Sequence, residues 1–227
     1  MGKSGVFLQA RIGSTRLPGK ALFKLCDHTI VSHAMNALKM VEADYYVLLT
    51  DEESFNSLST EAEKCGFLIF KGSADDVLDR FISAAKYFDV STIIRATGDN
   101  PLVDSTAANL IMASHFEKNA DYSGFDDMPL GTGVEILKTE SILRAAKESS
   151  EPYDHEHVSP YLYKNPDKFL INRIKAPDEF CLSGSTVTID TESDFNYIKQ
   201  LYEDLYKGKS LSIKDIIPWL KNHPYGK

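Results

Sequence analysis

The sequence reads Gln9-Ala10-Arg11-Ile12-Gly13-Ser14-Thr15-Arg16-Leu17-Pro18-Gly19-Lys20 directly after the short apolar run Val6-Phe7-Leu8. The apolar run predicts a buried strand, and the segment after it predicts a loop that leads toward a helix. Glycines let a backbone approach phosphate oxygens, amides donate hydrogen bonds to them, and the Arg11, Arg16 and Lys20 side chains can neutralise their charge. This combination predicts a polyphosphate site, so residues 9–20 are called the phosphate loop below.

Two common phosphate-binding motifs do not match this loop. A Walker A loop has four residues between its glycines, followed by Lys and then Ser or Thr. Here five residues separate Gly13 from Gly19, and Ala21 follows Lys20. The dinucleotide fingerprint G-x-G-x-x-G is absent as well. The loop therefore predicts phosphate binding of a different kind.

Composition is typical of a soluble globular protein. The 227 residues, 43% hydrophobic and 26% charged, are enough for one α/β domain with a sizeable core. The formal charge of -8 argues against a nucleic-acid binder, which usually has a basic surface. Three scattered cysteines, no apolar run of about 18 residues and no signal-peptide pattern predict a cytoplasmic protein with no membrane attachment.

Apolar runs alternate with helical patterns along the first half of the chain. The predicted strands cover Val6–Ala10, Tyr45–Thr50, Phe67–Phe70 and Thr92–Ala96. The predicted helices cover Ile30–Val41, Phe55–Lys64, Asp76–Phe88 and Asp104–Phe116. This order predicts βαβ units with right-handed crossovers, and therefore a parallel α/β sheet. Since no linker, repeat or low-complexity tract interrupts the chain, one domain is expected over residues 1–227.

The second half of the chain is less regular. Tyr122–Gly133 predicts a loop or hairpin, Tyr153–Tyr163 a helix despite Pro160, and Thr186–Asp190 a late strand. The remaining predicted elements are strands over Val134–Leu137 and Phe169–Ile174 and helices over Glu140–Glu148, Asp194–Leu205 and Ile213–Pro224.

Polar residues follow two further strands. The fourth predicted strand ends in Arg95-Ala96-Thr97-Gly98-Asp99-Asn100-Pro101, and the late strand ends in Asp190. Ligands of open α/β sheets bind beyond the carboxyl ends of strands, so these residues are expected to meet the phosphate loop in one crevice. Asp99 suits Mg²⁺, which takes one or two carboxylates, but it equally suits a turn. Asp190-Thr191 likewise resembles the start of a helix, where Asp or Thr caps free amides.

The phosphate loop resembles the N-terminal signature of the cytidylyltransferases that activate acidic sugars, the CMP-Kdo and CMP-sialic acid synthetases. It is most similar to the SpsF-like branch, which carries Q-A-R-x-x-S-x-R-L-P-G-K. Two other segments resemble this family. Thr97-Gly98-Asp99-Asn100-Pro101 is similar to its Q-G-D-x-P motif. Val187–Asp194 is similar to its late V-D-T-x-x-D element, with Glu192 in place of Pro.

The resemblance implies a fold and an activity. The fold would be a single-domain, Rossmann-like α/β/α structure of three layers with a mainly parallel mixed sheet, of the nucleotide-diphospho-sugar transferase type. A homodimer would transfer CMP from CTP to an acidic small-molecule acceptor and release pyrophosphate. Asp99 and Asp190 would bind the Mg²⁺ cofactor. The catalytic residues would be Arg11, Lys20 and Asp99, with the two cations neutralising charge on the leaving pyrophosphate.

Nucleotide contacts are expected from the first strand, the phosphate loop and Ser73–Arg80, which resembles the family's G-x-x-x-D-V-L-x-R. They are Leu8, Gln9, Ala10, Arg11, Gly13, Ser14, Arg16, Lys20 and Arg80. An alternative places Arg80 on a helix surface, paired with Asp76 four residues earlier.

The acceptor side rests on a further resemblance. Asp154–Tyr163 is similar to R-E-H-V-T-P-Y-L-Y of the SpsF-like branch, with His155 in place of Arg and Ser159 in place of Thr. Glu156 and His157 are the acceptor-binding residues in this segment, with packing or capping as the alternative. Gly133 and Glu135 are further acceptor-binding candidates because they lie near a loop after the fourth predicted helix, with an ordinary hairpin turn as the alternative. The substitution at His155 leaves the acceptor's identity open.

Three other functions compete with this one. A glycosyltransferase that uses nucleotide sugars would share the fold, but such enzymes typically carry Asp-x-Asp, which this chain lacks. A cytidylyltransferase acting on a phosphorylated alcohol or amine would give a CDP product, and nothing in the sequence excludes it. A non-catalytic nucleotide-binding module predicts loss of a metal carboxylate, whereas Asp99 and Asp190 are both present.

Overall fold

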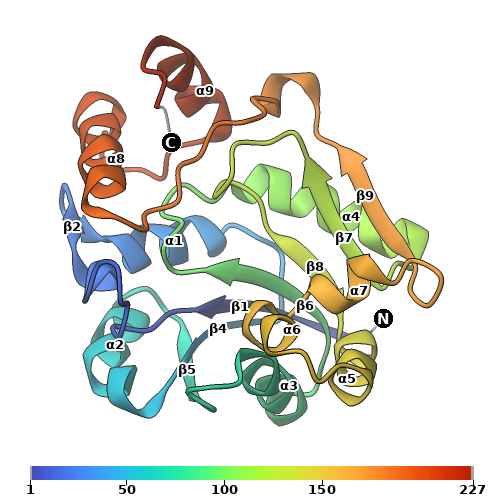
Figure 1. Cartoon of the computed structure of the whole chain (residues 1–227). Coiled ribbons are helices and arrows are strands. Elements are labelled where there is room, and N and C mark those ends of the chain that lie inside the picture. Colours follow the sequence, from blue (N-terminus) through green and yellow to red (C-terminus); the bar gives the residue numbers. More distant parts are fainter. Residues whose placement is uncertain (1, 226–227) are drawn as a thin grey trace.

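A computed structural model of the chain describes residues 2–225. Seven strands form one sheet, in the order β5 (Leu68–Lys71), β4 (Tyr45–Thr50), β1 (Lys3–Gln9), β6 (Val90–Thr97), β8 (Glu135–Lys138), β7 (Tyr122–Asp126) and β9 (Ile171–Lys175) (Figure 1). β8 runs antiparallel to both of its neighbours, while the other neighbouring strands pair in parallel. A separate short hairpin joins β2 (Lys24–Leu25) to β3 (His28–Thr29). The mainly parallel mixed sheet predicted from the sequence is confirmed.

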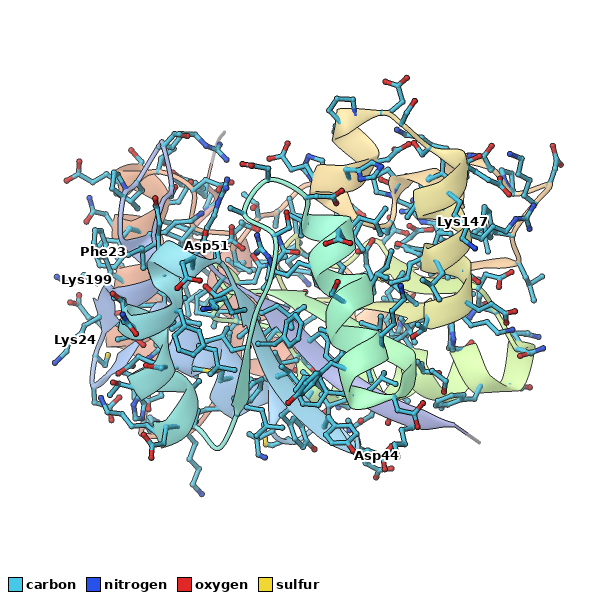
Figure 2. The ribbon with its side chains drawn as sticks, turned by 90° about the horizontal axis from the view of Figure 1, so that it is seen from below. Phe23, Lys24, Asp44, Asp51, Lys147 and Lys199 are labelled. Atoms are coloured by element: carbon cyan, nitrogen blue, oxygen red, sulfur yellow. The ribbon has the colours of Figure 1, made fainter. Side chains whose placement is uncertain are left out.

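Helices cover both faces of the sheet. α1 (Ile30–Leu38), α2 (Glu52–Lys64) and α4 (Ser105–Lys118) pack on the face that buries Leu8, Leu48 and Ile94. α3 (Val77–Phe88), α5 (Thr139–Glu148) and α7 (Pro160–Lys164) pack on the other face, against their strand neighbours Phe7, Val47 and Ile93. Figure 2 shows α3 and α5 side by side. Because successive strand residues point to opposite faces, these apolar runs fill two cores, and the three-layer prediction is confirmed.

Two C-terminal helices form a third core beside the end of β6. α8 (Glu192–Leu205) and α9 (Ile213–Asn222) bury their apolar faces together. Tyr202 Oη donates to the carbonyl of Pro101 at 3.0 Å, and the Ile213 amide donates to Asp104 Oδ2 at 2.8 Å. These two hydrogen bonds connect the C-terminal helices to the segment that follows β6.

Most long helices begin at a residue whose side chain accepts the backbone amide three positions later. These N-caps are Thr29, Asp51, Asp76, Asp104, Thr191 and Ser212. Such a cap satisfies an amide that has no partner within the helix, which explains why the helices start at these polar residues. Within residues 2–225, no helix combines the length and apolar character needed to cross a membrane.

Two predictions about the second half of the chain are wrong, and a third is decided between its two alternatives. Residues 122–133 form the first strand and the loop of a hairpin, because Tyr122–Asp126 is strand β7 and pairs antiparallel with β8. Residues 186–190 do not join the sheet, because their amides bond to loop carbonyls, Val187 to Leu130 and Ile189 to Asp99. The predicted helix 153–163 is two helices, α6 (Pro152–His157) and α7, since Pro160 cannot continue a helix and begins a new one.

Candidate active site

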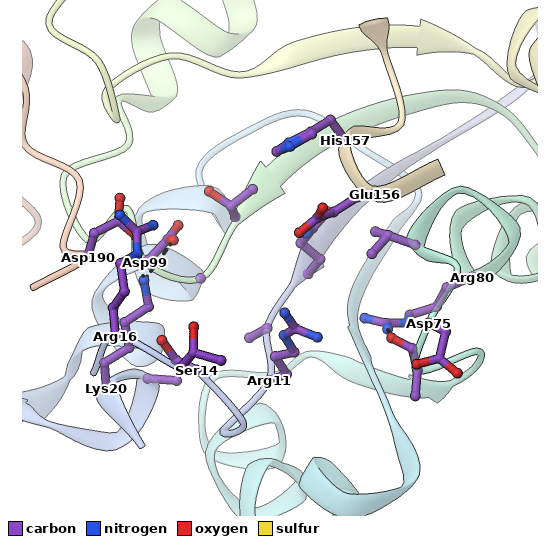
Figure 3. Close-up of a pocket in the computed structure, with 18 of the residues that line it drawn as sticks. Arg11, Ser14, Arg16, Lys20, Asp75, Arg80, Asp99, Glu156, His157 and Asp190 are labelled. Carbon is purple, nitrogen blue, oxygen red and sulfur yellow. Dashed lines mark hydrogen bonds and ion pairs between the residues drawn. The ribbon is translucent and has the colours of Figure 1, made fainter. Parts of the chain in front are cut away.

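A cavity of about 550 Å³ opens at the carboxyl ends of β1 and β6 (Figure 3). The phosphate loop forms one wall and α6 the opposite wall. The turn before α3 and the segment before α8 complete the lining. The predicted convergence of the first and fourth strand ends with Asp190 is therefore present, at the edge where α/β sheets bind ligands.

The phosphate loop folds back around one carbonyl group. The Ile12 carbonyl accepts hydrogen bonds from the amides of Ser14 and Gly19, both at 2.9 Å. The Ile12 amide donates to Ser54 Oγ of α2, also at 2.9 Å. Gly19 has a φ of 73°, which glycine adopts without a Cβ clash, and the short helix η1 (Lys20–Leu22) starts there. This closure brings Arg11 and Arg16, with neighbouring loop residues, to the cavity.

Lys20 lies between the two predicted metal ligands. Its Nζ is 3.0 Å from Asp99 Oδ2, 3.0 Å from Asp190 Oδ1 and 2.6 Å from the carbonyl oxygen of Ile189. The Nη2 of Arg16 also lies 3.0 Å from Asp190 Oδ1. The Lys20 side chain is only 12% exposed, so its charge depends on these partners. Two carboxylates from distant parts of the chain thus share one cation.

Close backbone contacts place the two aspartates. The Gly98 amide donates to the Gln9 carbonyl at 2.8 Å, and a Cβ at residue 98 would lie 2.7 Å from that of Ala10. Glycine alone permits this approach, which sets Asp99 beside the phosphate loop. Thr191, with Asp194 in a capping box, caps α8, so Asp190 is left to face Lys20. The capping interpretation of this segment therefore applies to Thr191.

Arg80 is buried beneath the turn that precedes α3. Its Nε donates to the Ser73 carbonyl at 2.7 Å, and its Nη2 donates to the carbonyls of Ser73 and Ala74. The residue is 2% exposed, and burial lowers the pKa of its guanidinium. The alternative pairing with Asp76 is wrong, because Asp76 caps α3 and pairs with His155. Arg80 lines the cavity and shapes the turn at its edge.

Arg95, to which the sequence assigned no role in the site, also lines the cavity. Arg95 of β6 forms an ion pair with Glu135 of β8, and its Nη2 donates weakly to Gln9 Oε1 at 3.4 Å. Glu135 also accepts hydrogen bonds from Tyr122 Oη and Ser159 Oγ. Burial and the nearby Glu135 raise the pKa of Tyr122, so its phenol stays a donor. An arginine inside an otherwise apolar strand was the signal for this residue.

The predicted acceptor and nucleotide residues divide into two groups. Glu156 and His157 of α6 line the cavity, opposite Arg11 and Ser14 (Figure 3). Gln9, Ala10, Ser14, Arg16, Lys20 and Arg80 line it as well. Four predicted site residues lie outside the lining: Leu8, Gly13, Gly133 and Glu135. Leu8 is fully buried in the core, and Glu135 acts through Arg95.

Comparison with known proteins identifies relatives of this chain. A family model described as cytidylyltransferase matches residues 6–214. The spore coat polysaccharide biosynthesis protein SpsF of Bacillus subtilis is 33% identical over 96% of this chain and 93% of its own length. The resemblance drawn from the phosphate loop is therefore confirmed over nearly the whole chain.

Solved structures agree with this relationship. A cytidylyltransferase from Leptospira borgpetersenii superposes with a TM-score of 0.90 at 31% identity, over 99% of this chain and 96% of that chain. A CMP:2-keto-3-deoxy-manno-octonic acid synthetase complexed with CTP superposes with a TM-score of 0.70 at 12% identity, over 89% of this chain and 99% of that chain. The second likeness establishes a common fold, which matches the predicted one.

Proposed function

We propose, since this chain belongs to the cytidylyltransferase family, that it transfers CMP from CTP to an acidic sugar and releases pyrophosphate. The product would be a CMP-sugar used as a precursor of surface polysaccharide, in line with the name of the SpsF relative. The observation that carries the proposal is the meeting of the cationic phosphate loop with Asp99 and Asp190 in one cavity.

The phosphate loop has cations suited to a triphosphate. Arg11 makes no ion pair with any other residue among 2–225 and lines the cavity, so its charge is available to a ligand. Arg16 and Lys20 are held at the opposite end of the loop by Asp190. A triphosphate with about four negative charges would be neutralised by these three side chains and by loop amides.

The two aspartates fit a divalent metal ion. Their carboxylate oxygens are hard ligands of the type that Mg²⁺ prefers, and they already converge on a positive charge, the ammonium of Lys20. The described residues offer no cluster of three or more acidic, histidine or cysteine ligands, so Mg²⁺ would complete its shell with water and phosphate oxygens. When bound by Asp99 and Asp190, Mg²⁺ would polarise the α-phosphate.

The protein side chains have distinct roles in this proposal. Arg11 and Lys20 stabilise charge that grows on the leaving pyrophosphate, while the loop amides orient it. Lys20 now contacts both carboxylates that would bind Mg²⁺, so with a metal bound its ammonium group would be available to the phosphate oxygens. Arg80, Gln9 and Ala10 line the cavity, and Arg80 with the backbone around Gln9 and Ala10 would contact the nucleoside of CTP.

The acceptor would bind between α6 and the end of β6. Glu156 and His157 present hydrogen-bonding groups there, and neither side chain hydrogen-bonds to another residue among 2–225. Among the lining arginines and lysines of residues 2–225, Arg95 belongs neither to the phosphate loop nor to α3, so it is the candidate partner for an acceptor carboxylate. Glu135 positions Arg95 for this contact.

The remaining parts of the proposal rest on the resemblance of the motifs. They are a cytoplasmic homodimer, Mg²⁺ as the metal, and a single cytidylyltransferase domain over residues 1–227.

CTP should stabilise the protein selectively. At about 100 times its dissociation constant, a ligand raises the free energy of unfolding by roughly 2.7 kcal/mol. Thermal unfolding with Mg²⁺ and either CTP, ATP, GTP, UTP or UDP-sugars measures this, and a chelator should weaken the effect of CTP. Stabilisation by UDP-sugars alone would contradict the proposal and favour a glycosyltransferase.

A further inference from the structure

A single histidine joins the two sides of the cavity. His155 of α6 lies with Nδ1 2.6 Å from Asp76 Oδ2 and Nε2 3.1 Å from the carbonyl oxygen of Ser149. A carboxylate and a carbonyl can only accept hydrogen bonds, so both ring nitrogens must donate. The geometry therefore describes an imidazolium ion paired with Asp76.

Asp76 belongs to the turn of residues 73–76, and it is itself fixed. Its Oδ1 accepts the Asp79 amide at 2.8 Å as the N-cap of α3, and its own amide donates to Ser73 Oγ at 3.0 Å. The Ser73 carbonyl is held in turn by Arg80. His155 is thus tied to the same turn that Arg80 shapes.

Residues adjacent to this ion pair line the cavity from both sides. Ala74 and Asp75 do so on the turn, and Glu156 and His157 do so on α6. His155 is not among the lining residues, so it does not face the ligand directly. We propose that His155 is a positioning residue, whose ion pair with Asp76 sets the spacing between the nucleotide side and the acceptor side of the cavity. The inference rests on the proposed function for its assignment of the cavity to CTP.

This positioning depends on pH. The charged groups that act on the imidazole are Asp76 from the turn before α3 and Asp154 on α6 itself. Asp154 is engaged by Ser149 Oγ and by Lys164 of α7. Hydrogen bonds to the Ser149 carbonyl and to Asp76 raise the pKa of His155 above 6.5. The ion pair is therefore complete below pH 6.5 and is lost as the pH rises through the raised pKa.

Three variants separate the effect of the charge on His155 from the effect of its contact with Asp76. His155→Arg keeps a cation at every pH. Asp76→Asn keeps a good N-cap and offers an amide donor to a neutral ring, so it preserves a contact that does not titrate. His155→Ala removes the contact. His28→Ala is the matched control, because His28 is a partly exposed histidine outside the cavity lining.

The measurement is the dissociation constant of CTP with Mg²⁺ from pH 5.5 to 8.5, together with NMR titration of the His155 ring. Ionisation of the triphosphate is common to all variants and cancels in the comparison. When the pH rises from 5.5 to 8.5, the affinity for CTP should fall in wild type and His28→Ala. This fall should be roughly two- to fivefold larger than the fall in His155→Arg and Asp76→Asn. His155→Ala should bind CTP weakly at every pH.

Two outcomes would count against the inference. If wild type, His155→Arg and Asp76→Asn bind CTP with the same pH dependence, the inference is overturned while the proposed function stands. If wild type binds no CTP at any pH, the proposed function is overturned, and the inference falls with it.

Discussion

Replacing Asp99 or Asp190 by Asn is expected to lower the rate of CMP transfer by a factor on the order of 10² to 10³. Asn preserves the size of the side chain and an oxygen for Lys20, but it removes the negative charge that a divalent metal requires. The two carboxylates approach the same ammonium group, each at 3.0 Å, so each should contribute to one metal site. Pyrophosphate release over a range of Mg²⁺ concentrations measures the effect.

Glu192→Gln is the control for this pair, because Glu192 lies two residues after Asp190 in the first turn of α8 and outside the cavity lining. It should retain the wild-type rate. If a double variant of Asp99 and Asp190 kept full turnover, neither residue would be a ligand of the metal. Circular dichroism of each variant separates loss of the metal site from loss of the fold.

Lys20→Met should have the second large effect, again lowering turnover by about 10² to 10³. The change removes a cation from the leaving pyrophosphate. It also leaves two carboxylates facing each other without their shared partner, so the free energy of unfolding should fall by about 1.5–3 kcal/mol without metal. Mg²⁺ should then stabilise this variant more than it stabilises wild type, since it no longer competes with the ammonium group. Thermal unfolding at increasing Mg²⁺ concentrations measures both effects.

Lys24→Met serves as the control, because Lys24 is an exposed residue of β2 outside the cavity lining. Equal stabilisation of the Lys20 and Lys24 variants by Mg²⁺ would mean that Lys20 and the metal do not share the two aspartates.

The part of the fold that the sequence predicted well is the part with regular periodicity. β4 has the predicted bounds Tyr45–Thr50, because an apolar run in a parallel sheet is buried on both faces and contrasts with its surroundings. The phosphate loop was recognisable because glycines and cations cluster directly after such a strand. The meeting of Asp99 with the loop followed from the rule that parallel strands end at the same edge.

The second half of the chain shows where local patterns fail. β7 contains Gly124 and ends in Asp126, so its turn-forming residues left a loop and a hairpin both open, and pairing with strands on both sides decides for the hairpin. Thr186–Asp190 has the apolar alternation of a strand, but its hydrogen bonds go to loops. In both segments, tertiary contacts decide the structure and local secondary-structure propensity does not.

The ion pairs that the sequence did not predict are contacts between distant segments of the chain. Arg95 and Glu135 are forty positions apart and pair only because β6 and β8 are neighbours. His155 and Asp76 are separated by a still longer stretch of chain and meet only when α6 packs on α3. Such pairs have no signature in local spacing.

The most direct test of the central claim is pyrophosphate release from CTP by the wild-type protein with Mg²⁺ and a panel of acceptors. The panel holds sugar acids with a free carboxylate, phosphorylated alcohols and phosphorylated amines, each tested also with ATP, GTP and UTP. We expect release with CTP and a sugar acid, and none with the other nucleotides. Release only with a phosphorylated alcohol or amine, giving a CDP product, would contradict the assignment of an acidic sugar as the acceptor.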